Sequence, residues 1–572
     1  MKRINYIFLP VILSIFFLSC DDILEVHSDR AVLIDDNAMK SDSLYAMFGI
    51  LSELQKIADS YVILGELRGE LLETSESADK YLKEISQFET YSPENPYTSN
   101  KADYYSIINN CNYVLHNVDT AKVYKGEKPL YKVMAAAAAV KAWTYMQLVL
   151  NFGEACYFDQ PILSIQEALK ENTPLRMEAL FPQLITELLP YKDIDRLNPG
   201  EFGGFQRSSV LYFPVSFVLG DLYLWMGQYQ EAATTYHELI YRNSYLIRAQ
   251  YANRREVIGI GANMEFTTNY TINWGALFTG KNAPEYITAI AVSNKDSYLT
   301  AIETLFYPEL SEISGLLDVA TLIPTQLAIN KFDSTLYFHD YKNNLGTTAL
   351  TTYGDLRMEN AILRIGIGDN FDNHYCKVEK YHLMNRPESA DDEDNLKEEA
   401  NIVVPYRVAL LYLRYAEAVN RLGKPNTAMA VLKNGLNRQA FLNPQVIPAS
   451  EIGSSLPEYM NFTDERFDAN IGIHARGAGY TARDSSFYII NMKGISQPTQ
   501  QDSILFVDDL IQKELVLEMA YEGTRFQDLM RFAIYRNDNA YLANIVAEKY
   551  RDAGTKERVR NKLISRENWY LK

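Results

Sequence analysis

Apolar residues recur at three- and four-residue spacing over three long stretches of the chain. These stretches are residues 36–59, 102–118 and 131–152. Such spacing places the apolar side chains on one face of a helix, so each stretch is predicted to be helical. The third stretch also contains Ala135 to Ala139, a run of the residue with the highest helix propensity. Side chains this small allow a neighbouring helix to approach closely.

Small residues at a fixed separation mark two further helical units. Gly220 and Ala232, within residues 210–241, lie twelve positions apart, and Ala416 and Ala428 repeat this separation. In a tetratricopeptide repeat, small residues with this separation lie where two helices cross. Two helical hairpins in matching register are therefore predicted. Ordinary pairs of amphipathic helices are the alternative explanation of the pattern.

One such hairpin cannot bury its apolar face alone, so neighbouring helices have to stack on it. We expect the helices near residues 131–152 and 505–535 to complete the stack. The predicted fold class is mainly α: a tetratricopeptide-like helical-hairpin scaffold, or α-α superhelix, with long irregular loop insertions. The scaffold is expected mainly in residues 36–241, 401–440 and 505–535.

Two long stretches between the predicted helices show weak periodicity. Residues 244–400 and 441–500 are rich in Gly, Asn, Thr and Tyr and are read as loop-rich insertions. Loops held on a rigid scaffold are natural places for a binding site. We expect residues 20–572 to form one domain that carries these insertions.

The first residues of the chain have the pattern of an export signal. A positive start precedes an apolar run from Ile7 to Leu18, which is too short to span a bilayer. Ser19 and Cys20 follow, and a small residue before a cysteine at this place is typical of a bacterial lipobox. Residues 1–19 are therefore predicted to be a lipoprotein signal peptide and Cys20 the lipid anchor. An ordinary signal peptide with a chance cysteine is the alternative, and no later segment is expected to cross a membrane.

Composition narrows the possible partners. The formal net charge is -18, and such an acidic surface repels nucleic acid, which is excluded as a partner. Apart from Cys20, three cysteines remain, and an odd number cannot pair completely, so disulfides are not expected to hold the fold. The chain has 41 tyrosines, whose flat apolar faces and polar tips suit both half-wet binding surfaces and helix interfaces.

The chemical motifs favour structural roles over catalytic ones. Glu514, Glu518 and Glu522 recur every four residues, so they share one helix face. An acid–base cluster is one interpretation, but pairing with Arg525 and Arg531 around the following turn is favoured. No catalytic residue is predicted, although a glycosidase carboxylate pair is defined by a spatial separation that sequence does not give.

Cofactor and metal motifs are incomplete. The glycine-rich segment from Gly472 to Gly479 lacks the Lys and the Ser or Thr that a P-loop needs, and a turn with positive φ explains its glycines better. His237 and Glu238 begin like a zinc-peptidase helix, but Tyr241 stands where the second histidine is required. No cofactor and no metal site is predicted.

Several segments together resemble the SusD/RagB family. Glu66 to Glu70 is similar to its early ELRGD segment, and Tyr412 to Ala418 is similar to its YLMYAEA helix. The most specific match is Glu514 to Leu529, which resembles the family pattern RxxELAFEGxRFxDLxRW. Tyr104, Asn109 and the alanine-rich helix that ends at Gly153 add to the resemblance.

The resemblance implies a location and a function. Members of this family are extracellular outer-membrane lipoproteins that sit as a lid over a SusC-like TonB-dependent transporter and bind oligosaccharides or, in some cases, peptides. The chain is accordingly expected to be a surface-exposed, lipid-anchored binding protein of the outer membrane and not an enzyme. A peptide-binding lipoprotein of the same transport system and a surface glycoside hydrolase are the alternatives.

A glycan site needs exposed aromatic faces with amides beside them. Trp274, next to Asn273, is the best candidate by composition. Tyr81 and Tyr97 follow the Glu66 segment, and by analogy this stretch faces the ligand in the family. Each of these residues could instead pack in the core or within a loop.

Overall fold

The predicted long helices are present. The computed structural model describes residues 42–119, 121, 128–170, 172–201, 204–258, 265–269, 274–292, 302–306, 319–343, 346–364, 376–384, 401–479, 490 and 495–571. The first three long helices are α2 (Asp42–Glu66), α4 (Lys101–Asn117) and α5 (Pro129–Phe152). Proline suits the first turn of α5, where its missing N–H would have no partner within the helix. The helix ends at Gly153, whose φ of 88° is the left-handed conformation that glycine adopts without strain.

The two predicted hairpins form and pack on each other. The first consists of α8 (Val215–Trp225) and α9 (Tyr229–Asn243), and the second of α14 (Val408–Arg421) and α15 (Pro425–Lys433). Gly220 lies at the first crossing, where an added Cβ would come within 2.4 Å of the Tyr236 ring. Helix α14 also packs against α9. The predicted helical-hairpin fold class is confirmed.

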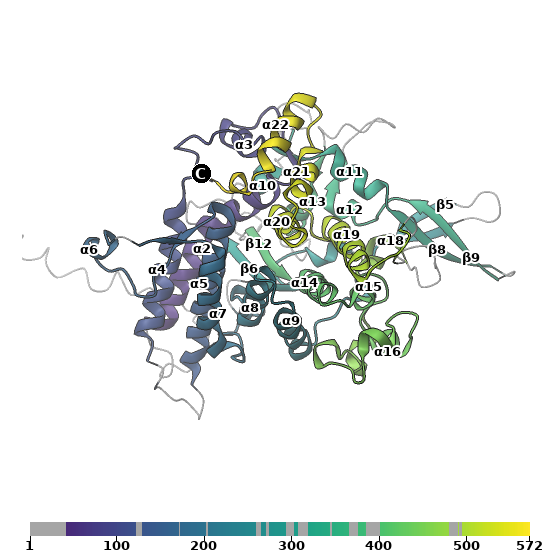
Figure 1. Ribbon diagram of the computed structural model, residues 1–572, viewed down its shortest axis with the longest axis horizontal. Coiled ribbons are helices and arrows are strands. Elements are labelled where there is room, and N and C mark those ends of the chain that lie inside the picture. Colours follow the sequence, from purple (N-terminus) through teal and green to yellow (C-terminus); the bar gives the residue numbers. More distant parts are fainter. Residues whose placement is uncertain are drawn as a thin grey trace, which may run out of the picture.

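Neighbouring helices complete the stack as expected. Helix α5 packs on α8 at one end, and α19 (Gln500–Met519) packs on α14 and α15 at the other (Figure 1). The segment 505–535 is divided, because a turn at Gly523 with φ of 92° separates α19 from α20 (Arg525–Arg536). The remaining helices are α3 (Lys80–Ser86), α6 (Ile165–Ala168), α7 (Met177–Leu188), α10 (Ile302–Phe306), α11 (Gln326–Asp333), α12 (Met358–Ala361), α13 (Glu379–Met384), α16 (Arg438–Leu442), α17 (Ala449–Ile452), α18 (Ala475–Ala478), α21 (Asn539–Ala547) and α22 (Ala553–Leu563).

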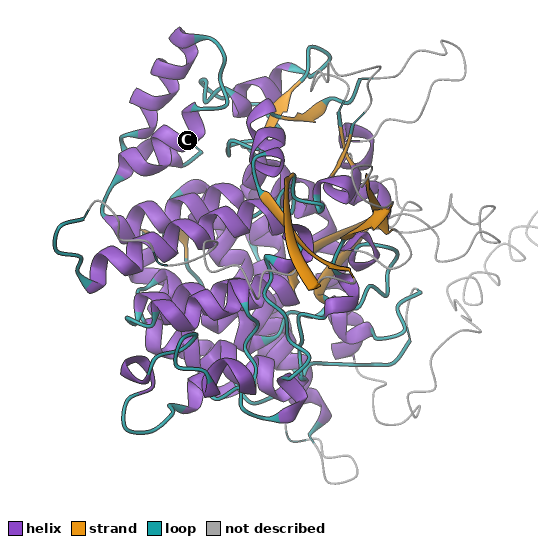
Figure 2. Cartoon of the chain, turned by 90° about the vertical axis from the view of Figure 1, so that its right-hand side faces the viewer, coloured by secondary structure: helices purple, strands orange, loops and turns teal. Residues whose placement is uncertain are grey.

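The insertion 244–400, predicted to be loop-rich, also carries strands. Within the described residues every strand pairs antiparallel with a single partner. The pairs are β1 (Leu72–Thr74) with β7 (Leu322–Pro324), β2 (Ala155–Cys156) with β3 (Pro174–Leu175), β4 (Arg254–Ile258) with β5 (Glu265–Asn269), β6 (Tyr286–Val292) with β12 (Asn401–Arg407), β8 (Leu336–Asn343) with β9 (Gly346–Tyr353), and β10 (Ile362–Leu363) with β11 (Lys377–Val378). Figure 2 shows strands in front of the helices on the side that faces the viewer, and Figure 1 shows β5, β8 and β9 on that side, whereas β6 and β12 lie in the middle of the scaffold.

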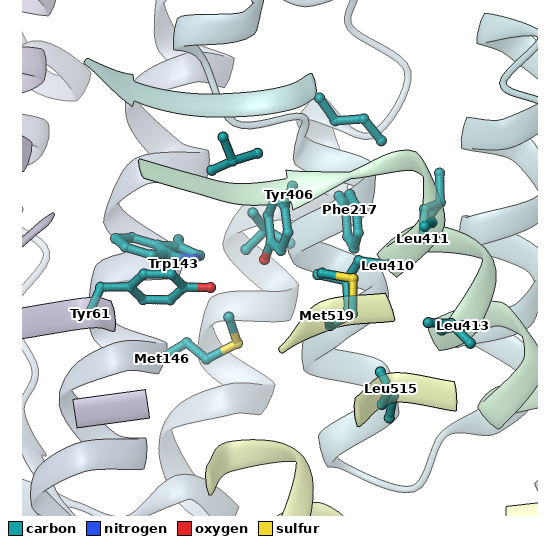
Figure 3. Close-up of a cluster of buried hydrophobic side chains, with 14 of the residues drawn as sticks. Tyr61, Trp143, Met146, Phe217, Tyr406, Leu410, Leu411, Leu413, Leu515 and Met519 are labelled. Carbon is teal, nitrogen blue, oxygen red and sulfur yellow. The ribbon is translucent and has the colours of Figure 1, made fainter. Parts of the chain in front are cut away.

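The ribbon formed by β6 and β12 carries aromatic residues into the core. Its register pairs Asn401 with Val292 and ends with Arg407 opposite Tyr286. Tyr406 stacks on Phe217 of α8 with ring centroids 3.8 Å apart, as Figure 3 shows. The hydrophobic cluster around these rings extends from α2 to the last described residues, so one core unites the scaffold with the strands.

Two core segments have the length and apolarity of a membrane helix. They are Leu130–Phe152 and Ser208–Trp225, so the expectation that no segment after the signal meets this criterion is wrong. The apolar windows are 94% and 83% buried inside the fold. Their apolarity is therefore explained by packing between other helices of the scaffold.

Candidate ligand-binding site

The glutamates of α19 form the centre of a buried ion-pair network. Glu518 accepts hydrogen bonds from Arg407 at 2.8 Å, from Arg476 at 2.8 Å and from Arg357 at 2.9 Å. Burial alone would raise the pKa of the Glu518 carboxyl, but the three guanidinium groups hold it below its ordinary value. This carboxylate therefore joins α19 to three distant segments of the chain.

The same balance acts on Glu514. Arg357 lies 2.5 Å from this carboxylate and His474 lies 2.8 Å from it. Burial opposes ionisation, but Arg357 and His474 outweigh it and lower the pKa of the Glu514 carboxyl to about 2. Within the network both carboxylates are held as anions, which suits a structural role.

The predicted partners of these glutamates were wrong. Arg525 pairs with Glu70 at 2.5 Å, and Arg531 pairs with Glu417 at 2.6 Å. Arg525 also donates to Gln512 of α19 at 2.5 Å, so it ties α20 to α19 as well as to Glu70. The glutamates of α19 pair instead with Arg357, Arg407 and Arg476. Among the glycines of residues 472–479, Gly479 has the predicted positive φ, at 76°. Gly477 has a different role, because it leaves room for Asp355, which a Cβ would meet at 1.8 Å.

Trp274 belongs to this network and is no part of an exposed platform. Its side chain is fully buried, and its indole N–H donates to Glu518 at 3.2 Å. Lys380 lies 4.7 Å above the indole ring, and Phe278 packs against the ring edge-on. A ring enclosed in this way has no face for a sugar, so the prediction that Trp274 binds ligand is wrong. Asn273 and Cys20 lie outside the described residues.

Residues Glu66 to Glu70, the segment that resembles ELRGD, connect the end of α2 to the C-terminal part of the chain. The Glu66 carboxylate accepts backbone N–H bonds from Tyr521 at 3.0 Å and from Gly523 at 2.8 Å. Burial raises the pKa of Glu66 to about 7, although these N–H groups oppose the shift. Arg68 donates to the carbonyl of Trp569 at 3.0 Å and to the side chain of Asn151 at 2.5 Å. The chain therefore leaves α2 in a fixed direction.

Tyr81 on α3 and Tyr97 on the segment that follows α3 are linked through one side chain. Both side chains are half-buried. Asn95, which is fully buried, donates to the carbonyl of Tyr81 at 3.1 Å and accepts the backbone N–H of Tyr97 at 3.1 Å. Burial raises the pKa of the Tyr97 hydroxyl to about 12, so it remains a hydrogen-bond donor. We call residues 80–100 the tyrosine loop, and ligand contact by its two tyrosines stays a prediction.

A pocket of about 350 Å³ opens at the end of α3. Its walls come from β1 and β7, from Gln87, and from the turn between α21 and α22. Lys549 lines it and donates to the carbonyl of Leu67 at 2.7 Å. Burial lowers the pKa of the Lys549 amine to about 7. We call this cavity the α3 pocket.

Sequence reasoning did not predict the α3 pocket. Glu73 and Asp552, two of its lining residues, are far apart in the chain and belong to no recognisable motif. The only local signal was their position after segments that resemble family motifs. Pocket volumes of about 300–1,000 Å³ are usual for small-molecule sites, and the α3 pocket lies at the lower end of this range.

Comparisons with known proteins agree with this architecture. The profile described as the SusD family matches residues 330–570. The SusD-like protein P38 of Formosa agariphila is 22% identical over 81% of this chain and 86% of its own length. A crystal structure of a SusD superfamily protein from Bacteroides thetaiotaomicron superposes with a TM-score of 0.55 at 15% identity, covering 86% of this chain and 88% of that one.

A second solved structure shares the fold. Surface glycan-binding protein A from Bacteroides fluxus has a TM-score of 0.53 at 16% identity, with 91% of this chain and 94% of that chain covered. The helical hairpins and the long insertions held on them place the chain in the class of helical-hairpin scaffold proteins. Within that class the chain is similar to the SusD family, whose profile matches its residues 330–570.

Proposed function

We propose that this protein is a cell-surface glycan-binding lipoprotein that captures oligosaccharides and delivers them to a partner TonB-dependent outer-membrane transporter. The similarity of residues 330–570 to the SusD family supports this proposal, as does the glycan binding stated in the name of the Bacteroides fluxus protein of the same fold. The observation that carries the proposal is the pair of half-buried tyrosines whose backbones Asn95 links. The exposed part of each ring offers an apolar surface to the C–H groups of a sugar ring.

The energetics favour weak capture by the protein alone. An aromatic contact contributes about 0.5–1.5 kcal/mol beyond area burial, so two tyrosines supply roughly 1–3 kcal/mol. A millimolar affinity already corresponds to about 4 kcal/mol. Tight retention therefore depends on the transporter, which would enclose the ligand against the tyrosine loop.

Isothermal titration calorimetry of the mature protein tests the ligand class. The panel is maltohexaose, cellohexaose, xylohexaose, laminarihexaose and mannohexaose, with a mixture of hexapeptides beside it. Tyr81→Ala and Tyr97→Ala are each expected to weaken binding of the preferred glycan roughly 2- to 10-fold. Tyr113→Ala is the matched control, because Tyr113 is exposed on α4 outside the tyrosine loop.

The possible outcomes separate the candidate functions. If the Tyr81→Ala/Tyr97→Ala double variant binds the glycan with the affinity of the wild type, the tyrosine loop is not part of the binding site. Binding of peptides without any glycan would replace the proposal by the peptide-binding alternative. Steady release of reducing ends from the bound glycan would establish a glycoside hydrolase.

Membrane attachment and the transporter are tested separately. We expect Cys20→Ala to release the protein from the outer-membrane fraction while its glycan affinity in solution is unchanged. Wild-type protein solubilised from that membrane should co-purify with a TonB-dependent transporter. An unmodified thiol at Cys20 in the mature protein, measured by mass spectrometry, would contradict the lipid anchor.

A further inference from the structure

A second and larger groove lies beside α16. It has a volume of about 660 Å³ and is bounded by the end of α15, by α16, and by the segments around residues 248–250 and 468–471. In Figure 1, α16 lies at the lower right, whereas α3 and α22, which flank the α3 pocket, lie at the top. The two cavities are therefore well separated on the molecule. We call this second cavity the α16 groove.

The floor of the α16 groove is rigid. Asn470 is almost completely buried and uses its whole side-chain amide. It accepts the backbone N–H of Ile247 at 2.8 Å and donates to the carbonyl of Leu436 at 2.8 Å and to the Tyr412 hydroxyl at 3.0 Å. Gly435 packs so closely on this segment that a Cβ would meet the Asn470 carbonyl oxygen at 2.3 Å. A ligand entering the groove thus meets a preformed surface.

The walls of the groove offer unused hydrogen-bonding groups. Gln250, Asn434 and Gln439 line it with side-chain amides, and Arg248 adds a guanidinium group. Within the described part of the chain, no hydrogen bond or ion pair involves these four side chains. Each amide provides two donors and one acceptor, and the guanidinium provides five donors. This set complements a ligand that carries many hydroxyl groups.

The charge and shape of the groove narrow the ligand class further. Asp468, the carboxylate of the groove, is already paired with Arg438 outside it. Among the described lining residues none is aromatic, whereas Ala249 and Val446 offer small apolar surfaces. A ligand in the groove would be held mainly by hydrogen bonds to its hydroxyl groups, with smaller contributions from C–H contacts. Stacking on an aromatic ring would not contribute.

We propose that the α16 groove is a second oligosaccharide-binding site, which takes a neutral polyhydroxylated glycan through the Asn434, Gln439, Gln250 and Arg248 side chains. This inference rests on the proposed function and extends it to a separate face of the scaffold. A polysaccharide held at one site is presented to the other at high effective concentration, so two weak sites together retain a long chain much better than either alone.

The test compares groove variants with the wild-type mature protein. Asn434→Ala/Gln439→Ala removes two amides, and Gln445→Ala is the matched control because Gln445 is exposed next to the groove and does not line it. Hexasaccharides of the same panel, each carrying a photoreactive diazirine, are cross-linked to the protein and the labelled peptides are mapped by mass spectrometry. Calorimetry with the unmodified sugars gives stoichiometry and affinity.

We expect cross-links on residues 434–446 in the wild type and in Gln445→Ala, reduced at least fivefold in the double variant. Cross-links in the tyrosine loop should be unchanged. Retention of the 434–446 cross-links in the double variant, or their absence from a wild-type protein that binds the sugar elsewhere, would overturn the groove site alone. Failure of the wild type to bind any member of the panel would instead overturn the proposed function.

Discussion

Glu66 accepts the backbone N–H of Gly523 at 2.8 Å across 457 positions of the chain. Its carboxylate also accepts the N–H groups of Tyr521, Thr524 and Arg525, so one side chain closes the turn between α19 and α20. That turn sets the direction of α20, and Glu66 ties it to the C-terminal end of α2. Two segments far apart in the sequence therefore depend on a single buried carboxylate.

Glu66→Ala should destabilise the fold strongly. Each buried donor that loses its acceptor costs about 1–3 kcal/mol, and several are lost at once, so we expect a loss of about 3 kcal/mol or more in the free energy of unfolding. Glu66→Gln keeps one carbonyl oxygen as an acceptor and should lose less. Urea denaturation followed by circular dichroism measures both, and equal stability of Glu66→Ala and wild type would contradict the role of this residue.

Trp274→Phe separates a structural tryptophan from a ligand-binding one. The variant removes the indole N–H that donates to Glu518 and keeps an aromatic ring in the core. We expect a stability loss of about 1–3 kcal/mol, because a buried acceptor loses a donor, with the glycan affinity unchanged. Denaturation and calorimetry on the same preparation check this. A clear fall in affinity without loss of stability would return Trp274 to the ligand site.

Gly220→Ala tests the helix crossing between α8 and α9. The added methyl would lie 2.4 Å from the Tyr236 ring, so we expect destabilisation by about 1–3 kcal/mol despite the better helix propensity of alanine. Gly49→Ala is the control, since a Cβ there meets no atom within 4 Å. That variant should be unchanged or up to about 1 kcal/mol more stable. Equal effects of the two substitutions would argue against close packing at Gly220.

The Lys549 amine predicts a pH dependence of stability. Burial lowers its pKa from 10.5 to about 7, so between these values the unfolded chain holds a proton that the folded chain has released. Above pH 10.5 the amine is neutral in both states and does not lower the free energy of unfolding. As the pH falls from 10.5 towards 7, protonation of the unfolded chain lowers the free energy of unfolding progressively. The stability difference between wild type and Lys549→Met should rise by at most about 1.4 kcal/mol per pH unit in this window.

Urea denaturation at pH 7, 8 and 9 measures this slope. Lys556→Met on neighbouring α22 serves as the control, because Lys556 is partly exposed and pairs with Glu548. Its stability difference from wild type should stay constant over the same range. If the free energies of unfolding of Lys549→Met and wild type change in parallel with pH, the amine stays protonated in the folded state.

Local patterns were enough to predict the scaffold. The twelve-residue separation of Gly220 and Ala232 predicted that α8 and α9 pack on each other, which they do, with Gly220 against the Tyr236 ring. Such contacts between neighbouring helices are encoded within a short window of sequence. The four-residue spacing gave the correct helix face for Glu514 and Glu518, but Glu522 lies beyond the end of α19, in the turn before α20. Both predictions needed only helix periodicity and the size of side chains.

Contacts between distant segments were beyond such reasoning. The partners of Glu518 are Arg357, Arg407 and Arg476, each brought in by a different insertion or strand, while the nearer Arg525 turns to Glu70. The residues next to Trp274 in the sequence are those expected at a sugar-binding surface. The burial of Trp274, however, depends on where Lys380 and Phe278 pack. The sequence thus predicted the tyrosine loop from its place after a motif, and could not predict the α3 pocket or the α16 groove.

The bond from Arg68 to the carbonyl of Trp569 spans 501 positions and has a consequence for biosynthesis. Residues near position 570 bind the segment directly after α2. The nascent chain therefore cannot complete the core around α2 until almost the whole polypeptide has left the ribosome. A polypeptide truncated before this point would therefore lack the partner that closes the end of α2.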